Sequence, residues 1–217
     1  MVAKPAPHPA RFIEPVPDDG IHNDHGALRR FLADVPAEAR LLDLGSGSRR
    51  LRPGVLNLDI VANDDVDIVG DGHRLPFRDR SFDAVVLQTV IEHVLEPETV
   101  IAETARVLVP GGRAYIEAPF LYPVHGDADY YRWTRKGLEY VVGKHLDILD
   151  SGLTLGPAST LSLTWRGFIE ARMSHLHWAV RNWIAWATSW LPRLEGRTVP
   201  DQATVYATTY VVARARL

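Results

Sequence analysis

The chain has 217 residues, of which 46% are hydrophobic, and it carries a formal net charge of -3 with no cysteine. This length and hydrophobic content suit one domain with a sizeable core. The charge balance lacks the basic footprint of proteins that bind nucleic-acid backbones, so no nucleic-acid partner is expected. The absence of cysteine excludes a disulfide framework and a thiolate metal site.

The N-terminal stretch is rich in proline, with Pro5, Pro7, Pro9, Pro15 and Pro17. Proline fixes φ and removes an amide donor, so we expect residues 1–22 to form an extended or disordered arm before a domain that spans 23–217. This stretch has no apolar signal-peptide core, and no apolar run of the chain has the length needed to cross a bilayer. A cytoplasmic location is therefore expected.

The spacing of apolar residues predicts alternating helices and strands in the remaining sequence. Helices are expected at about 24–33, 97–108 and 134–142, with Thr134 capping the third and Pro110-Gly111-Gly112 ending the second. Strands are expected at 40–44, 55–59, 66–69, 82–88, 113–118, 146–149 and 203–213. Strands separated by helical connections favour an α/β fold with a parallel, doubly wound sheet.

The first strand runs into a glycine-rich turn, Asp43-Leu44-Gly45-Ser46-Gly47. Glycine at positions 45 and 47 permits a tight turn and a close approach of main-chain amides, because a Cβ would clash there and positive φ costs glycine little. The pattern is typical of a nucleoside cofactor site, although a plain tight loop gives the same short motif.

The next two strands also end in acidic residues. Asp59 closes the second strand, where such folds hold a ribose by its two hydroxyls. Asp71 follows the third strand and can accept a hydrogen bond from the exocyclic amine of a purine. One such acid is commonly a solvated strand end, but three successive strands that end in aspartate favour a nucleoside-binding edge.

Further motifs follow in order: Asp71-Gly72-His73-Arg74-Leu75-Pro76-Phe77, Ser81-Phe82-Asp83, Glu92-His93-Val94 and Arg106-Val107-Leu108-Val109-Pro110-Gly111-Gly112. Together with the glycine-rich turn and Asp59, they resemble the ordered motifs of class I S-adenosylmethionine-dependent methyltransferases over residues 39–150. The subgroup with these signatures contains many small-molecule methyltransferases. The resemblance implies an α/β fold, a Rossmann-like doubly wound sheet of about seven strands, mostly parallel with an antiparallel last strand.

The resemblance also implies that S-adenosyl-L-methionine is the cofactor and that the turns after the first four strands hold it. The residues concerned are Asp43, Gly45, Ser46, Gly47, Asp59, Ile60, Asp71, Gly72, His73 and Gln88. Gln88 is expected to touch the methionine part of the cofactor or the substrate.

The first crossover departs from the family pattern. Ser48 and Arg49 stand where a third glycine is usual, and too few residues separate Gly47 from Val55 for a crossover helix. We expect a turn or short loop there instead. Its arginines at 49, 50 and 52 are placed to pair with the cofactor's carboxylate or to form a solvated basic loop, and the second interpretation is favoured.

The acceptor site is expected after the fifth strand, because ligands in open α/β sheets bind beyond the carboxyl ends of the strands. Residues 119–134 form the densest polar and aromatic cluster of the chain. Methyl transfer requires alignment of the acceptor and, for a hydroxyl, removal of its proton. His125 is the predicted base, because a neutral imidazole accepts a proton at physiological pH.

Neighbouring residues support this hypothesis. Asp127 or Asp129 would orient the imidazole of His125, and His93 is a second catalytic candidate. The residues expected to hold the acceptor follow directly and are Tyr130, Tyr131 and Arg132. Alternatively, His125 and the aspartates form a hydrogen-bonded loop over the cofactor without proton transfer, and the Glu92-His93 pair fixes a helix start. No metal is expected, because no tight His/Asp/Glu ligand spacing completes a site.

A tryptophan-rich helical insertion is expected at about 158–195, with Trp165, Trp178, Trp183, Trp186 and Trp190. The last three recur on one helical face. A helix that packs on the sheet, or on a second subunit in a homodimer, is favoured over a substrate lid or an interfacial membrane helix. In a membrane helix, basic residues would meet lipid phosphates; in the other cases they form the solvated side: Arg172, His175, His177 and Arg181.

The leading hypothesis is a methyltransferase that transfers the methyl group of S-adenosylmethionine to oxygen, or nitrogen, of a small-molecule acceptor such as a sugar or cell-envelope precursor. One alternative is a non-catalytic methyltransferase-like binding or scaffold module, which a pocket blocked by Arg49 or Arg50 would favour. Another is a peripheral membrane methyltransferase of a lipid-linked acceptor, with contact through the tryptophan-rich helix.

Overall fold

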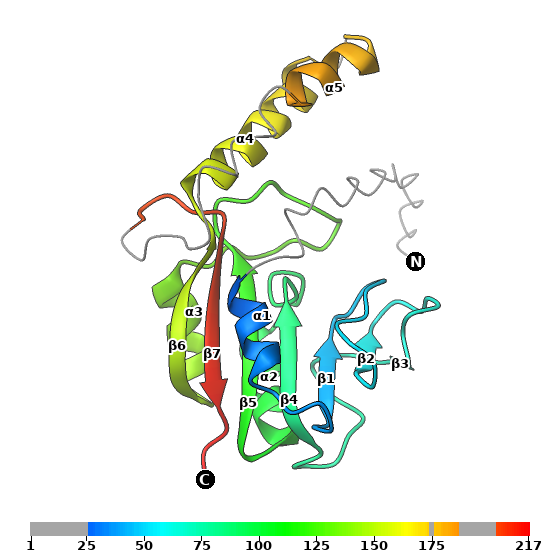
Figure 1. Cartoon of the computed structure of the whole chain (residues 1–217), viewed down its shortest axis with the longest axis vertical. Helices are drawn as coiled ribbons and strands as arrows, with labels where there is room; N and C mark the ends of the chain where they lie inside the picture. Colours follow the sequence, from blue (N-terminus) through cyan, green and yellow to red (C-terminus); the bar gives the residue numbers. More distant parts are fainter. Residues whose placement is uncertain (1–25, 174–175, 187–202) are drawn as a thin grey trace, which may run out of the picture.

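The computed structural model describes residues 26–173, 176–186 and 203–217; the proline-rich arm at 1–22 lies outside them. Its centre is a seven-stranded sheet with the strand order β3-β2-β1-β4-β5-β7-β6 (Figure 1). The strands are β1 (Leu41–Leu44), β2 (Leu56–Asp59), β3 (Ile68–Val69), β4 (Phe82–Gln88), β5 (Leu108–Pro119), β6 (Asp147–Leu155) and β7 (Thr208–Arg214).

The sheet has the directions expected from the sequence. Neighbouring strands from β3 to β5 pair in parallel, whereas β7 pairs antiparallel with both β5 and β6. The prediction of a mostly parallel, doubly wound sheet with an antiparallel last strand is confirmed. The parallel strands therefore end at one edge, where their loops meet.

Helices cover both faces of the sheet, which buries most of the side chains of its central strands. The helices are α1 (Gly26–Ala33), α2 (Pro97–Val107), α3 (Arg135–Gly143), α4 (Pro157–Arg172) and α5 (Trp178–Trp186). Successive side chains of a strand point to opposite faces, so Tyr115 of β5 packs with Phe31 of α1 while Ile116 joins the core that contains Ile101 of α2.

Several element boundaries follow local chemistry. Thr134 is the predicted cap of α3, and its hydroxyl accepts a hydrogen bond from the Gly137 amide at 3.1 Å. No helix lies between β1 and β2, which confirms the shortened crossover. The predicted helix at 97–108 is confirmed as α2, which ends at Val107; β5 begins directly at Leu108 and includes Pro110-Gly111-Gly112, where its pairing with β4 is irregular.

The tryptophan-rich insertion forms an arm. Figure 1 shows α4 and α5 projecting beyond the edge where the parallel strands end. Trp178, Trp183 and Trp186 are between 63% and 68% exposed, so the expectation that this helix packs on the sheet is wrong. Trp190 and His175 lie outside the described residues. None of the helices in the described ranges combines the length and the apolar character that a membrane span requires.

We expect Leu42→Ala to destabilise the domain by about 2–5 kcal/mol, because Leu42 in β1 is fully buried and its loss leaves a cavity. The measurement is urea unfolding followed by circular dichroism. Leu161→Ala is the matched control, since Leu161 on α4 is 57% exposed and its loss should cost less than about 1 kcal/mol. Equal costs for the two variants would contradict this core assignment.

Candidate functional site

The glycine-rich turn after β1 has the backbone geometry that its sequence predicts. Gly45 has a φ of +72°, and its amide donates a 2.8 Å hydrogen bond to the carbonyl of Leu58 in β2. A Cβ at Gly45 would lie 2.5 Å from Cγ2 of Val90, so only glycine fits between the turn and the loop after β4. Gly47 has a φ of +56° and faces open space. Ser46 is buried between them.

Asp59 joins this turn to the end of β2. Its Oδ2 accepts a 2.8 Å hydrogen bond from the Gly47 amide, and its Oδ1 accepts one of 2.9 Å from the Val61 amide. Each carboxylate oxygen has a second lone pair, so these contacts leave acceptor capacity for ribose hydroxyls. Ile60, the next residue, is 69% exposed. The predicted ribose ligand and the predicted amide cradle are thus held together.

The loop after β3 contains Asp71, Gly72 and His73. The Oδ1 of Asp71 accepts a hydrogen bond from the His73 amide at 2.9 Å and contacts its Nδ1 at 2.7 Å. These hydrogen bonds from His73 hold the pKa of the Asp71 carboxyl below its usual range. The Nε2 of His73 in turn accepts from the Glu96 amide at 3.3 Å, which ties this loop to the start of α2.

Arg49 bridges two predicted cofactor residues. Its Nε and Nη2 lie 3.1 and 2.9 Å from the two carboxylate oxygens of Asp43, and its Nη1 donates to Oε1 of Gln88 at 2.5 Å. The Asp43 side chain is fully buried, and burial raises its pKa despite the opposing effect of the Arg49 guanidinium. The guanidinium thus offsets the desolvation of a carboxylate at the end of β1.

The other arginines of this loop are also fixed in place. Arg50 pairs with Asp67 at 3.0 Å, and Arg52 donates to the carbonyls of Val35 and Pro36 at 2.9 and 2.7 Å. The interpretation of residues 48–52 as a solvated basic loop therefore fits the exposed Arg50, but not the half-buried Arg49 and Arg52. The short crossover between β1 and β2 has no helix. The hydrogen bonds and ion pairs of its arginine side chains hold it in place instead.

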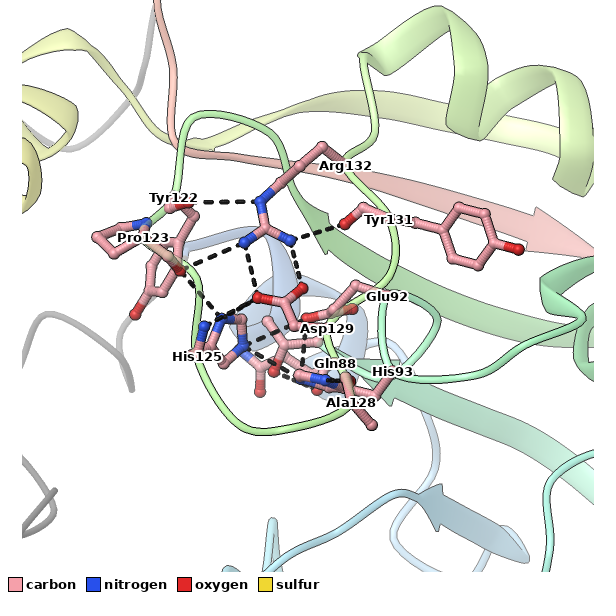
Figure 2. A network of polar contacts seen from close by, with 11 residues as sticks. Gln88, Glu92, His93, Tyr122, Pro123, His125, Ala128, Asp129, Tyr131 and Arg132 are labelled. Carbon is pink, nitrogen blue, oxygen red and sulfur yellow. Dashed lines mark hydrogen bonds and ion pairs between the residues drawn. The ribbon is translucent and has the colours of Figure 1, made fainter. Parts of the chain in front are cut away.

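The loop after β5 closes on itself through one ion pair. The guanidinium of Arg132 contacts both carboxylate oxygens of Asp129, one of them at 2.7 Å, and also donates to the carbonyls of Tyr122, Pro123 and Tyr131 (Figure 2). The Asp129 side chain is 1% exposed, and the Arg132 guanidinium lowers its pKa. The contacts of Arg132 therefore lie within the loop itself. That Arg132 also holds the acceptor stays a prediction.

His125 is oriented by Asp129. Its amide donates to Oδ2 of Asp129 at 2.9 Å, and its Nδ1 lies 3.3 Å from the same oxygen and 3.2 Å from the carbonyl of Pro123. Asp127 is exposed and has no hydrogen bond or ion pair with His125 in the described part of the chain. Of the two aspartates proposed as the orienting partner, Asp129 is the one that makes the contact, because it lies four residues after the histidine in the closed loop.

His93 and His125 meet beside a buried carboxylate (Figure 2). Their Nε2 atoms are 3.1 Å apart, and each lies 3.7 Å from Oε1 of Glu92. The Glu92 side chain is fully buried, which raises its pKa to about 8, and burial also lowers the pKa of His125. The argument that no tight ligand spacing exists does not hold, because the fold brings together residues 32 positions apart.

The two tyrosines predicted to hold the acceptor flank this loop. Tyr130 is 52% exposed, while the hydroxyl of Tyr131 donates to the carbonyl of Leu95 at 2.8 Å. Tyr131 thus links the loop after β5 to the loop after β4. Tyr130 presents its ring to solvent at the same edge of the sheet.

Two residues of the site have no signal in the sequence. Thr89, directly after Gln88, has a φ of +56°, which is rare for a β-branched residue and marks a strained turn. Glu117 in β5 is buried and accepts hydrogen bonds from the hydroxyls of Tyr115 and Thr154 at 2.6 and 2.9 Å. The Nε2 of Gln88 donates a 3.4 Å hydrogen bond to Oε2 of Glu117, so this carboxylate helps to fix the Gln88 side chain.

Known methyltransferases resemble this chain in sequence and in fold. A family model described as a methyltransferase domain matches residues 42–116, which contain the glycine-rich turn, Asp59, Asp71 and β4. Residues 42–116 therefore match a methyltransferase domain, and they include motifs that resemble those of class I S-adenosylmethionine-dependent methyltransferases. This confirms the resemblance seen in the sequence, and with it the type of fold and the cofactor of the family.

Relatives of this methyltransferase domain match in sequence and in structure. A demethylmenaquinone methyltransferase of Renibacterium salmoninarum is 33% identical over 144 residues, which cover 54% of this chain and 60% of that protein. The chain thus spans less than two thirds of the length of this relative. The fold of the present chain matches that of the 1,6-didemethyltoxoflavin-N1-methyltransferase of Burkholderia thailandensis, solved with S-adenosylhomocysteine. The TM-score is 0.57 at 15% identity, and the match covers 92% of this chain and 80% of that chain.

A third match is a putative methyltransferase of Haloferax volcanii, solved in complex with the Trm112 methyltransferase activator. It has a TM-score of 0.57 and 21% identity, and the match covers 92% of this chain and 93% of that chain. At these identities the solved structures establish the fold of the methyltransferase domain alone.

We expect Gly45→Ala to cost more stability than Gly54→Ala. Both glycines have positive φ, +72° and +81°, so alanine costs about 1–2 kcal/mol at either position from the backbone alone. Only at Gly45 must Val90 also move, whereas nothing lies within 4 Å of a Cβ at Gly54. Urea unfolding of both variants measures the difference. Equal losses would show that Val90 yields freely and that the turn is not sterically fixed.

Proposed function

We propose that this chain transfers the methyl group of S-adenosylmethionine to oxygen or nitrogen of a small-molecule acceptor. The observation that carries the proposal is the joined edge of β1 and β2, where Asp59 holds the Gly47 amide beside the buried Asp43. The relative named demethylmenaquinone methyltransferase and the toxoflavin-precursor enzyme both have names that indicate small acceptors. A sugar or cell-envelope precursor stays our proposed acceptor class.

In this proposal the residues after the first four strands bind the cofactor. The open face of Gly47 and the positive φ of Gly45 allow a nucleoside to lie close to the backbone of this turn. Asp59 would take the ribose hydroxyls, and Asp71 the adenine amine. Arg49, fixed between Asp43 and Gln88, presents a cation where the carboxylate of the methionine part would lie.

The loop after β5 would receive the acceptor. When bound, the cofactor supplies an electrophilic methyl group on a sulfonium sulfur. The Nε2 of His125 is the proton acceptor of an attacking hydroxyl, while Asp129 and the carbonyl of Pro123 hold the Nδ1 proton and so fix the tautomer. His93 lies against the same Nε2 and shares this role.

We expect the parent chain to bind S-adenosylmethionine and S-adenosylhomocysteine with micromolar affinity in calorimetric titrations, and Asp59→Ala to weaken binding at least about ten-fold. The reason is the loss of both the ribose contacts and the anchor of the Gly47 amide. Asp64→Ala is the matched control, since Asp64 is exposed in the following loop and should leave binding unchanged.

Two results would contradict the proposal in different ways. Absence of binding by the parent would favour a scaffold module in which Arg49 fills the cofactor site. Equal binding by the parent and Asp59→Ala would show that the ribose is held elsewhere. Binding by the parent that is weakened in Asp59→Ala justifies assays of methyl transfer to sugar and cell-envelope precursors.

A peripheral membrane methyltransferase is the second candidate function, and the exposed tryptophans of α5 are the observation that favours it. Trp183 and Trp186 lie three residues apart on one helical face, are 65% and 68% exposed, and belong to an arm that projects from the edge with the candidate site (Figure 1). Tryptophan suits the boundary between headgroups and acyl chains. The arm would then bring the acceptor loop to a lipid-linked acceptor.

We expect the full chain to sediment with vesicles of anionic phospholipid, and the double variant Trp183→Ala, Trp186→Ala to lose at least about half of this binding. Tyr140→Ala is the matched control, because Tyr140 is 71% exposed on α3, away from the arm. Unchanged binding by the double variant, or no binding by the parent, would refute the membrane role. Concentration-dependent dimerisation of the parent would instead favour the second-subunit interpretation.

A further inference from the structure

Three potential metal-ligand atoms lie close together beyond the end of β4, and none of the three donates a hydrogen-bonding proton to another. They are Nε2 of His93, Nε2 of His125 and a carboxylate oxygen of Glu92. Within the described residues, neither oxygen of the fully buried Glu92 side chain has a hydrogen-bond partner. Burial without hydrogen-bond partners makes this carboxyl costly to ionise, so Glu92 is either protonated or paired with a positive group that these contacts do not supply.

The hydrogen bonds on the far side of both imidazoles fix which ring nitrogen is free. Nδ1 of His93 lies 2.5 Å from the carbonyl of Ala128, and Nδ1 of His125 lies 3.2 Å from the carbonyl of Pro123. A carbonyl only accepts hydrogen bonds, so each Nδ1 carries the proton. In the neutral rings, both Nε2 lone pairs therefore point into the same space at a separation of 3.1 Å.

The spacing of the three atoms matches the size of a metal ion. The Nε2 atoms are 3.1 Å apart and each lies 3.7 Å from Oε1 of Glu92. A single point lies about 2.0 Å from all three atoms, which is the length of zinc–nitrogen and zinc–carboxylate bonds.

We propose that Glu92, His93 and His125 form a binding site for one divalent transition-metal cation of the Zn²⁺, Co²⁺ or Fe²⁺ class. Two imidazoles and one carboxylate favour these ions over Mg²⁺, which prefers an all-oxygen environment. The backbone carbonyls of Ala128 and Pro123, with Asp129 at 3.3 Å from Nδ1 of His125, provide the outer hydrogen bonds that orient metal-binding histidines.

Three protein ligands leave at least one coordination position open, as in catalytic rather than structural zinc sites. This part of the inference rests on the proposed function: an acceptor oxygen at the open position would lie in the acceptor loop and become more acidic. With the cation bound, Nε2 of His125 is a metal ligand, so the role of proton acceptor proposed above for His125 applies to the metal-free site. Binding of the cation does not depend on turnover and can be measured alone.

The test is calorimetric titration of the full chain, stripped with EDTA and desalted, with Zn²⁺ and separately with Mg²⁺. We expect one equivalent of Zn²⁺ to bind with micromolar affinity or better and no comparable binding of Mg²⁺. Glu92→Gln and His125→Ala should each weaken Zn²⁺ binding at least about ten-fold. His145→Ala, which removes a histidine that faces Glu98 on the surface, is the matched control and should bind like the parent.

Spectra and cofactor binding keep the outcomes distinct. Visible absorption of Co²⁺ bound to the parent should be lost in Glu92→Gln and His125→Ala, while both variants keep the circular dichroism of the parent. Unchanged Zn²⁺ binding in these variants, or none by the parent, would overturn the metal site and leave a proton shared between the histidines. If S-adenosylmethionine binds while Zn²⁺ does not, only this inference fails; the reverse result defeats the proposed function and leaves the metal site standing.

Discussion

The position of β4 between β1 and β5 is the constraint on which the rest of the structure depends. Parallel pairing on both sides aligns the carboxyl ends of these strands, so the turn after β1 and the loops after β4 and β5 must share one edge. Both faces of the strands are buried, so polar side chains can only gather where the strands end. Val90, pressed against Gly45, shows how closely the loops after β1 and β4 approach each other.

Burial at this edge of the sheet makes each carboxyl group costly to ionise. Some of these carboxylates are paired with a guanidinium that offsets the cost, and one is not. Asp43 is matched by the Arg49 guanidinium, and Asp129 by Arg132. Glu92 is equally buried but faces only two imidazole nitrogens, and its pKa rises to about 8. The contrast separates carboxylates that hold loops in place from one that is prepared to receive a positive group. Functional sites are where such uncompensated groups persist.

The arm of α4 and α5 adds a surface that the catalytic fold does not need. It departs from the end of β6 at Pro157 and places exposed tryptophans beyond the edge that carries the acceptor loop (Figure 1). An apolar surface left exposed on a projecting element generally meets a partner, a ligand or a membrane. In the function proposed above, the projection of the arm from the edge that carries the loop after β5 connects it with the choice of acceptor.

The sequence by itself determined the sheet, its antiparallel last strand and the shortened first crossover, and it predicted the residues of the nucleoside-binding edge. These features depend on local patterns: apolar runs, glycines at positions of positive φ, and aspartates at strand ends. Only the tertiary structure decided that Arg49 spans Asp43 and Gln88, that Asp129 rather than Asp127 orients His125, and that His125 meets Glu92 and His93. These contacts join residues from different strands, and their geometry is set by how the loops pack. No spacing along the chain encodes that packing, because contacts across 32 or 39 residues exist only once the sheet has aligned the strand ends.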